Sequence, residues 1–419
     1  MNFRPKSAVM VAALAVTVAC SRLPGQGERT QVRQEQGEGF TLDIIDNSAT
    51  FSQALAINAS GQMFGIREVV DESGNIFSQE NFFFDGQKVT KLPLLKDFTN
   101  VEVAALSDTG LIVGYASRPI GNPAGSLTGV VWDSTTGEMT RLMPFPGDTA
   151  SQAQDISADG RRISGYTNGS QPARLRPCVW NWNPEKNSWD AELLSVLQDF
   201  NPYTMTSGVM ISPDGLRVST CITVEELPNG QFDSSLFQWE WADDQWTRRL
   251  VSDEQMVVRD MNNRGEIAAT YTGRTGRDPC FIDPQGKLTR IGTFAGDVSG
   301  EARGINADGT VVGFSDDPNG PEGGPQAFIW KKGKSQALKL PADTVFSSAF
   351  GINDRGQIAG LLDVIVSTTD GKQSAAKGSK SDGRKEADAQ DTSGDKTAEQ
   401  DAEPEVKTLA FRWTPQSSL

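Results

Sequence analysis

The sequence predicts an all-β fold, a seven-bladed β-propeller closed by an N-terminal strand that joins the last blade. Three observations predict it. A tetrad Asn/Ser-x-x-Gly occurs seven times, with successive starts 44 to 55 residues apart. Each tetrad is followed by a segment rich in Phe, Val, Ile and Trp, and then by a further strand-like segment. One more strand-like segment, residues 41–45, stands alone before the first tetrad.

The tetrad is a turn signal. Asn or Ser at its first position can hydrogen-bond the backbone two residues further on, and Gly at its fourth position tolerates a positive φ. An apolar residue precedes each tetrad and a short apolar segment follows it, so each tetrad predicts two strands joined by a tight turn. The seven tetrads begin at Asn58, Ser107, Ser157, Ser212, Asn262, Asn306 and Asn353.

The second repeated segment is clearest in Ala327-Phe328-Ile329-Trp330, and Trp fills its last position in five of the seven units. Aromatic and β-branched residues at this density favour a strand. The Trp is expected to pack between neighbouring sheets, because it carries the largest apolar area available. A Gly turn and another strand follow, as in residues 286–291. A period of about 40–50 residues with several strands per unit is typical of a propeller blade.

The two ends of the chain predict how the ring closes. Residues 41–45 resemble the strand that completes a unit, whereas the last unit ends near Trp413 without one. We therefore expect residues 41–45 to lie beside residues 409–414, which would leave no open edge in the ring. The alternative is an open solenoid of repeats.

The combined pattern, apolar-Asn-x-x-Gly-x-Val-Val-Gly-Phe at residues 305–314 followed by Ala327-Phe328-x-Trp330, resembles the HAF-type extracellular repeat of bacterial surface and secreted proteins. The resemblance covers residues 40 to 419 apart from one insert. The His of the family's His-Ala-Phe triplet is absent, and Gln326 stands in its place. The resemblance implies a propeller-like fold and an extracytoplasmic setting. It implies no reaction and no catalytic residues.

Residues 1–19 are predicted to be a signal peptide rather than part of the fold. Two basic residues precede an apolar run over residues 8–19, which is too short to span a bilayer as a helix. The segment resembles a bacterial lipoprotein signal in which Cys20 becomes the lipidated N-terminus, although Thr17 stands where that motif usually has Leu. Ser21, at the second position of the expected mature chain, resembles the residue found there in lipoproteins sent to the outer membrane. Secretion without a lipid and an uncleaved anchor are the alternatives.

Two further segments are predicted to be disordered. Residues 20–39 contain mainly Gln, Gly, Glu and Arg and are expected to form a flexible tether. Residues 368–405 contain no aromatic residue and interrupt the last unit, so they are expected to form a solvated loop insert of the domain that spans residues 40–419. A partner-binding tail is the alternative for this insert.

Charge and composition exclude several functions. The formal net charge is −15, which argues against nucleic acid and against direct adhesion to anionic lipid, and is compatible with a basic partner. The chain contains no His, so Ser-His-Asp and Cys-His catalysis and His-ligated metal sites are excluded. No cofactor and no metal site are predicted. Hydrolysis or elimination at sugars by two paired carboxylates is not excluded, but no spacing in the sequence identifies such a pair of Asp or Glu residues.

Three cysteines remain after Cys20. Cys178 and Cys280 are read as occupying the position of Ala327, two blades apart and therefore too distant to bond to each other. They are expected to be small buried residues. A disulfide from Cys221 to one of them, and a metal site, are the alternatives.

Four other features are candidate binding sites. Residues 315–322 carry many oxygen ligands but lack the EF-hand spacing, so an ordinary polar turn is expected in preference to a calcium site. Asp283 is read as replacing the Trp of unit 5. We interpret this replacement as sequence drift at a tolerant edge in preference to the mark of a binding face. Two pairs of tryptophans at alternate spacing could stack on sugar rings but suit packing between strands better; they are Trp182, Trp189, Trp241 and Trp246.

The sequence therefore predicts a surface-anchored, non-catalytic binding or scaffolding propeller of the bacterial cell envelope. The expected partner is an envelope protein or glycan of unknown identity, and the expected state is a monomer. The location is the outer membrane or cell surface through the lipid on Cys20, or secretion if the lipoprotein motif fails. The alternative is a histidine-free, carboxylate-dependent glycan hydrolase or lyase.

The lipid attachment is directly testable. Cys20→Ala should release the protein from membranes into the soluble fraction, because the acyl chains on that residue would be its only firm hold. Mass spectrometry of the native protein should show a diacylglyceryl-modified Cys20. Unchanged membrane retention of the variant would contradict the prediction.

Overall fold

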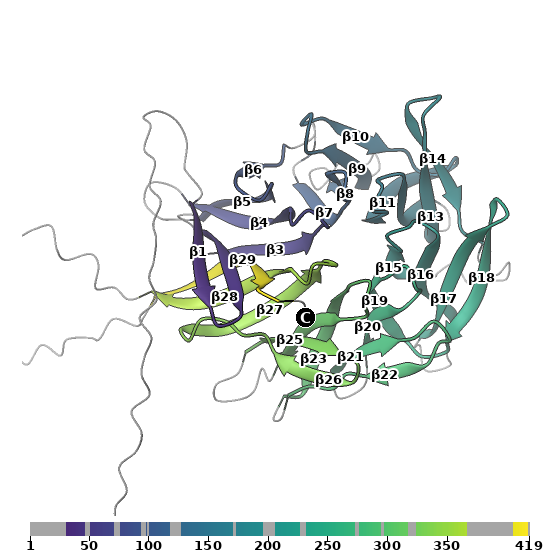
Figure 1. Ribbon diagram of the computed structural model, residues 1–419. Helices are drawn as coiled ribbons and strands as arrows, with labels where there is room; N and C mark the ends of the chain where they lie inside the picture. Colours follow the sequence, from purple (N-terminus) through teal and green to yellow (C-terminus); the bar gives the residue numbers. More distant parts are fainter. Residues whose placement is uncertain are drawn as a thin grey trace, which may run out of the picture.

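The computed structural model is a ring of seven β-sheets arranged as blades around a central channel (Figure 1). It describes residues 31–46, 51–70, 76–93, 98, 100–117, 127–170, 173–195, 206–226, 232–272, 276–294, 297–316, 324–366 and 405–417. All regular elements within these ranges are strands, and no helix there could cross a membrane. The predicted signal peptide, Cys20, Ser21 and residues 368–404 of the insert lie outside these ranges.

Six blades each contain four strands in sequence order, with every neighbouring pair antiparallel. Blade 1 contains β3 (Ser52–Ile57), β4 (Met63–Val70), β5 (Ile76–Phe84) and β6 (Val89–Lys91). Blade 2 contains β7 (Asn100–Leu106), β8 (Leu111–Ser117), β9 (Leu127–Asp133) and β10 (Met139–Leu142). Blade 3 contains β11 (Asp148–Ile156), β12 (Arg162–Ser170), β13 (Ala173–Asn183) and β14 (Ser188–Leu193).

The second half of the ring repeats this order. Blade 4 contains β15 (Thr206–Ile211), β16 (Arg217–Glu226), β17 (Phe232–Ala242) and β18 (Gln245–Ser252). Blade 5 contains β19 (Met256–Met261), β20 (Ile267–Thr272), β21 (Arg277–Ile282) and β22 (Leu288–Arg290). Blade 6 contains β23 (Ser299–Ile305), β24 (Val311–Asp316), β25 (Gln326–Lys331) and β26 (Lys334–Ala337).

Blade 7 closes the ring as the sequence predicts. It contains β27 (Thr344–Ile352), β28 (Ile358–Val366), β29 (Glu405–Pro415), and then β2 (Phe40–Asp46) from the other end of the chain. β2 runs antiparallel to β29, with Leu42 opposite Trp413 and Ile45 opposite Ala410. The predicted contact between residues 41–45 and residues 409–414 is confirmed, and the open solenoid is excluded.

One prediction about the N-terminus is wrong. Residues 31–37 are not tether but form β1 (Gln31–Gly37), a fifth strand of blade 7 that pairs with β2. Gly39, at φ 83°, allows the tight turn between the two strands. An edge strand is held mainly by backbone hydrogen bonds, so its polar side chains remain partly or fully exposed and its composition gives little strand signal.

The tetrads form the predicted turns. The Gly at the fourth position of all seven has a positive φ, between 70° at Gly160 and 84° at Gly110. In the first tetrad the Asn58 side-chain oxygen accepts hydrogen bonds from the backbone N–H groups of Ser60 and Gln62, at 3.0 Å each. Asn and Gly therefore have the turn roles that their positions indicated.

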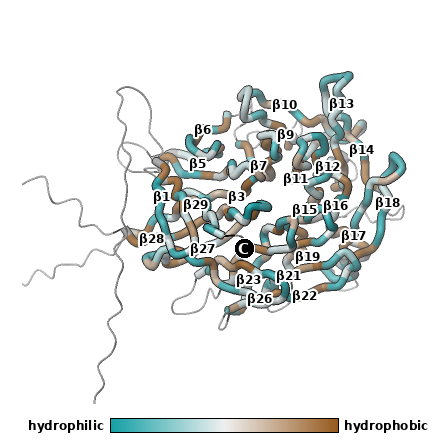
Figure 2. The backbone as a smooth tube through the Cα atoms, viewed as in Figure 1, coloured by the Kyte–Doolittle hydropathy of each residue, from teal (hydrophilic) through white to brown (hydrophobic). Residues whose placement is uncertain are grey.

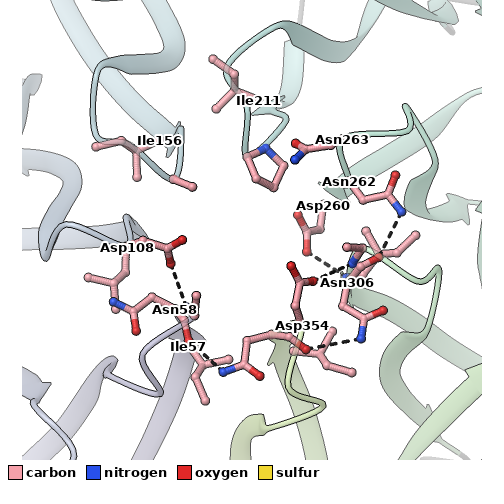
Figure 3. Close-up of a pocket in the computed structure, with 18 residues that line it drawn as sticks. Ile57, Asn58, Asp108, Ile156, Ile211, Asp260, Asn262, Asn263, Asn306 and Asp354 are labelled. Atoms are coloured by element: carbon pink, nitrogen blue, oxygen red, sulfur yellow. Dashed lines mark hydrogen bonds between the residues drawn. The ribbon is translucent and has the colours of Figure 1, made fainter. Parts of the chain in front are cut away.

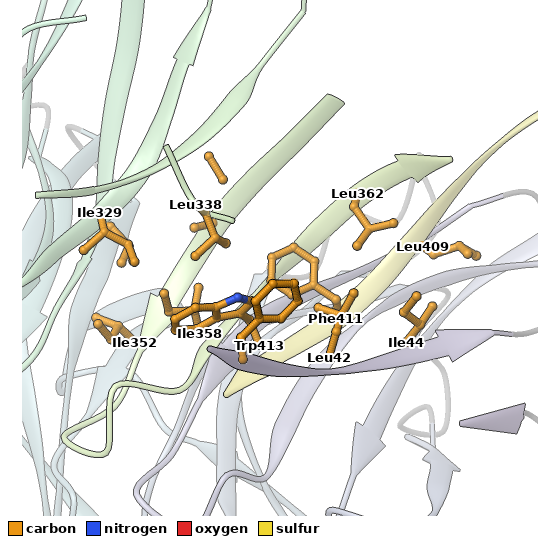
Figure 4. Close-up of a cluster of buried hydrophobic side chains, with 14 of the residues drawn as sticks. Leu42, Ile44, Ile329, Leu338, Ile352, Ile358, Leu362, Leu409, Phe411 and Trp413 are labelled. Carbon is orange, nitrogen blue, oxygen red and sulfur yellow. The ribbon is translucent and has the colours of Figure 1, made fainter. Parts of the chain in front are cut away.

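The Phe/Trp segments form the third strand of each blade, and three of their Trp residues link neighbouring blades. The indole nitrogen of Trp180 donates to the Met143 carbonyl at 2.8 Å, and Trp239 and Trp413 bind the preceding blade in the same way. Figure 4 shows Trp413 in the core between blades 6 and 7, against Ile358. Figure 2 shows such apolar stretches all around the ring.

The strand register corrects two readings of these segments. Trp330 lies opposite Val311, and Ile282 lies opposite the equivalent residue Ile267, so Ile282 rather than Asp283 replaces the Trp of blade 5. Asp283 begins the hairpin turn and accepts hydrogen bonds from its backbone.

The cysteine positions are corrected by the same comparison. Cys178 lies opposite Gly165, as Phe328 lies opposite Gly313, so Cys178 occupies the Phe328 position and not that of Ala327. Cys280, opposite Ala269, occupies the same position in blade 5. A small residue in each segment does not by itself fix the position, which follows only from its partner on the second strand.

The closing contact carries a buried ion pair that can be tested. Arg412 on β29 donates to Asp43 on β2 at 2.7 and 2.9 Å and to the Gly61 carbonyl of blade 1 at 2.8 Å. Arg412→Ala would leave Asp43, 7% exposed, without its cation and should lower the free energy of unfolding by about 3 kcal/mol. Chemical denaturation would measure this.

A surface pair supplies the control for that measurement. Lys186 and Asp190 also form an ion pair at 2.9 Å, but their side chains are 63% and 45% exposed. Lys186→Ala should therefore change the free energy of unfolding by less than about 1 kcal/mol. Equal effects of the two substitutions would show that the closing ion pair is not what holds blade 7 together.

Candidate binding face at the channel mouth

The seven tetrads gather at one end of the channel (Figure 3). Each joins the first and second strands of its blade, so alternating strand direction places all seven turns at the same end. The mouth is a cavity of about 170 Å³. The second residue of every tetrad lines it, as does the first residue of the four tetrads that begin with Asn. The apolar residue before the tetrad lines it in six blades, and in blade 5 Asp260 does so instead.

Hydrogen bonds run from each turn to the next and form a closed belt around the mouth. Asn at the first tetrad position donates its side-chain N–H to the backbone carbonyl of the equivalent residue in the following blade. The distances are 3.0 Å from Asn58 to Ser107, 3.0 Å from Asn262 to Asn306, and 3.3 Å from Asn306 to Asn353. Asn353 closes the circle onto the Asn58 carbonyl at 2.8 Å.

The three blades with Ser at the first tetrad position make these links with other groups. The backbone N–H of Asp108 donates to the Ala158 carbonyl at 3.0 Å, and that of Ala158 donates to Pro213 at 2.8 Å. The backbone N–H of Asp214 donates to the Asn263 side chain at 2.7 Å. All seven neighbouring pairs of turns are thus connected.

The carboxylates at the mouth take part in this belt. Asp108 accepts from the Ala59 N–H at 2.8 Å, and Asp354 accepts from the Ala307 N–H at 2.7 Å. Asp260 accepts from Ile305 in the next blade at 2.9 Å and from its own neighbour Met261 at 2.7 Å. Each of these three side chains therefore holds a backbone N–H group of an adjacent blade.

Asp155 of blade 3 likewise holds a backbone N–H group of the next blade. Its two oxygens accept from Ile156 at 2.8 Å and from Ile211 of blade 4 at 2.9 Å. Both Asp155 and Asp260 occur where the first strand has a β-bulge. Burial raises the pKa of Asp155 to about 8, with a further contribution from Asp260, and burial raises the pKa of Asp260 to about 7.

A second hollow lies outside the mouth, between blades 2 and 3. It has a volume of about 630 Å³ and shares two tetrads with the mouth, because Thr109 and Asp159 line it while Asp108 and Ala158 line the channel. Its outer wall is the hairpin of β13 and β14, where Trp182 and Trp189 lie directly opposite each other. We call this hollow the blade 2–3 groove.

An ion cluster lies between blades 5 and 6. Glu301, 1% exposed, binds Arg259 at 2.9 Å, Arg303 at 2.8 Å and also Arg277. Burial, together with the charge of Arg259, lowers the pKa of Arg303 to about 10. One buried carboxylate thus ties three guanidinium groups from two blades, and we assign the cluster a packing role.

Cys178, Cys221 and Cys280 are buried free thiols, so the disulfide alternative is wrong. No group of three Cys, Asp or Glu side chains that could hold a metal ion occurs within the described ranges. Most of residues 315–322 fall outside those ranges. Of the two tryptophan pairs, which were expected to suit packing between strands better than stacking on sugars, Trp182 and Trp189 line the groove.

Comparison with known proteins shows the fold alone. No family model and no curated protein matches the sequence. The β-propeller domain of the Trilobed protease from Pyrococcus furiosus, described as having an open velcro topology, is 10% identical over 75% of this chain and 90% of that one, with a TM-score of 0.48. TolB from Acinetobacter baumannii is 14% identical over 88% of this chain and 79% of that one, with a TM-score of 0.37.

A third similar structure is dipeptidyl peptidase 4 from Porphyromonas gingivalis, 12% identical over 81% of this chain and 57% of that chain, with a TM-score of 0.43. Proteins with peptidase names and proteins with other names thus both occur among the similar folds. This chain is a β-propeller, and here β2 pairs with β29 to close it. Its function must be argued from its own surfaces.

The raised pKa values of Asp155 and Asp260 predict a pH dependence of stability. Between the ordinary carboxyl pKa of 3.8 and about 8, the folded protein binds more protons than the unfolded chain, so stability should fall as pH rises through that window. The melting temperature should be higher at pH 5.5 than at pH 8.5. The double variant Asp155→Asn/Asp260→Asn should lose most of that difference.

The exposed residue Asp243 supplies the control, since Asp243→Asn should keep the full difference. A melting temperature that rises with pH in the wild type would show that the two channel carboxyls are ionised throughout this range.

Proposed function

We propose that the chain is a lipid-anchored, non-catalytic binding propeller of the bacterial cell envelope, which binds its partner on the face formed by the tetrad turns. The observation that carries the proposal is the use of the mouth carboxylates. Asp108, Asp260 and Asp354 each accept a backbone N–H from an adjacent blade. Both oxygens of Asp260 accept backbone N–H groups, and the exposed residues Asp108 and Asp354 each use one oxygen in this way. Acid–base catalysis needs carboxyl oxygens that can reach a substrate, so the hydrogen bonds of Asp260 favour a role in holding the ring together.

The face beside the mouth offers what binding needs. The blade 2–3 groove opens on the same end of the ring and combines half-buried tryptophans with exposed hydroxyl and carboxylate groups. Hollows of this size with aromatic walls and a few polar groups are typical ligand sites. The negative net charge suits a basic partner.

A carboxylate-dependent glycan hydrolase or lyase is the second candidate. The observation that favours it is the raised pKa of Asp155 and Asp260, because a carboxyl that holds its proton near neutral pH can serve as a general acid. The hydrogen bonds that these side chains accept from Ile211 and Ile305 argue for the structural role.

The binding face can be tested by immobilising the ring in two orientations. The native thiols of the propeller are buried, so a single exposed cysteine can be coupled selectively. Thr135→Cys places the coupling on the tetrad face, in the hairpin of β9 and β10. Met143→Cys, at a residue 65% exposed, places it at the opposite end of the strands.

The ring coupled through Met143→Cys should retain one envelope protein or glycan from detergent-solubilised envelopes, and the ring coupled through Thr135→Cys should not. The reverse pattern would assign binding to the opposite face. Purified protein should show no turnover of polysaccharide, peptide or ester substrates. Turnover that disappears in Asp260→Asn would replace the binding proposal with the carboxylate enzyme.

A further inference from the structure

Two neighbouring blades carry the same tryptophan pair. In blade 3, Trp182 and Trp189 lie opposite each other on the hairpin of β13 and β14, and in blade 4 Trp241 and Trp246 do so on the hairpin of β17 and β18. The ring centroids are 5.2 Å apart at an interplanar angle of 61° in both pairs. The two hairpins therefore present the same aromatic surface toward the preceding blade.

The pair in blade 4 is covered by an arginine of the same chain. The Arg162 guanidinium lies over Trp241 at 4.6 Å and over Trp246 at 5.5 Å from the ring centroids. It also donates to the Gly215 carbonyl at 2.9 Å. A planar cation that stacks on aromatic faces while its N–H groups bind oxygen is a stable arrangement in proteins.

The pair in blade 3 lacks this cover. The residue of blade 2 equivalent to Arg162 is Leu111, because each is the first residue of the second strand of its blade. In addition, the carbonyl of Arg162 accepts from the Ser157 N–H, and the carbonyl of Leu111 accepts from the Ser107 N–H in the same way. Both residues lie opposite the third strand in the same register. A leucine cannot reach both rings or supply a charge, and the open blade 2–3 groove, about 630 Å³ in volume, remains in front of Trp182 and Trp189.

The groove has the charge that a cation needs. Its lining includes the carboxylates of Asp133, Glu138 and Asp159 against the single guanidinium of Arg161. One oxygen of Asp133 and one of Asp159 accept from nearby backbone N–H groups, at 2.7 and 3.0 Å. Exposed Thr135 and Thr136 add hydroxyl acceptors at the rim.

We propose that the blade 2–3 groove binds an arginine side chain of a basic partner polypeptide, which stacks on Trp182 and Trp189 as Arg162 stacks on the pair in blade 4. The inference rests on the proposed binding function and names the chemistry of the partner. The groove volume leaves space for the residues on either side of that arginine. Guanidinium is favoured over a sugar because the chain itself fills the equivalent position with guanidinium.

Peptides of matched shape test the proposal on the purified full chain. The probe is acetyl-Gly-Arg-Gly-amide, and its control carries citrulline, which keeps the shape and loses the charge. The Arg peptide should shift the indole N–H signals of Trp182 and Trp189 in NMR spectra, assigned with Trp→Phe variants. It should bind at least about fivefold more tightly than the citrulline peptide, and the difference should shrink at high salt.

Substitutions at Leu111 and Arg162, the equivalent residues of blades 2 and 3, test the site. Leu111→Arg should place the chain's own guanidinium in the groove and weaken peptide binding about tenfold or more. Gln285→Arg, at an exposed turn of blade 5, adds the same charge elsewhere and should leave the affinity unchanged. Arg162→Leu should open the equivalent groove of blade 4 and raise the number of peptide sites from one to two. Melting temperatures would confirm that each variant is folded.

Several outcomes would overturn the inference. Equal binding of the Arg and citrulline peptides, or unchanged binding to Leu111→Arg, would show that the groove does not recognise guanidinium. An oligosaccharide that shifts the same indoles, where the Arg peptide does not, would make it a glycan site. If the immobilised ring retains its envelope partner equally with and without Leu111→Arg, the proposed function stands and this groove is not its site. Failure of both orientations to retain anything would remove the proposed function, and the peptide titration would still decide the groove.

Discussion

The belt of hydrogen bonds between tetrad turns is the constraint on which the ring depends. A propeller has no single central core, so each blade is fixed to its two neighbours by apolar packing between the blades and by hydrogen bonds near the axis, where the first strands meet. Here the side chain of the Asn at the first tetrad position spans from one blade to the next at four of the seven junctions, and the last link returns from Asn353 to Asn58. That link, with the pairing of β2 and β29, makes the array a closed circle.

This constraint explains why some residues of the tetrad face join the blades while others line the groove. Polar atoms near the axis join the blades, and each carboxylate of the channel mouth gives at least one oxygen to these links. Residues one position further along the same turns, such as Thr109 and Asp159, line the groove. The side chains of Thr109 and Asp159 make their hydrogen bonds within their own turns, so differences between blades at these side chains can produce a binding site without disturbing the belt.

The sequence predicts the parts of this fold that depend on local chemistry. Positive φ at Gly61 and its six equivalents follows from the tetrads, and closure follows from the position of residues 41–45. β1 was not predicted, because an edge strand of polar residues carries no periodic signal. The cross-blade hydrogen bonds of Asp155 and Asp260 join residues 56 and 45 positions apart, and nothing local marks them.

The blade 2–3 groove shows that strand register, and not spacing along the sequence, identifies equivalent residues in different blades. Counting from the tetrad glycines pairs Leu111 with Arg161, because each directly follows its Gly. The turn of blade 3 contains one extra residue, and the hydrogen bond from the Ser157 N–H to the Arg162 carbonyl shows that Arg162 is the true equivalent. Only then does the comparison of the two tryptophan pairs have meaning: one is covered by an arginine and the other faces an open hollow. An internal repeat therefore supplies its own reference structure, in which one blade shows what the next blade lacks, provided that the residues are matched by their pairing across strands.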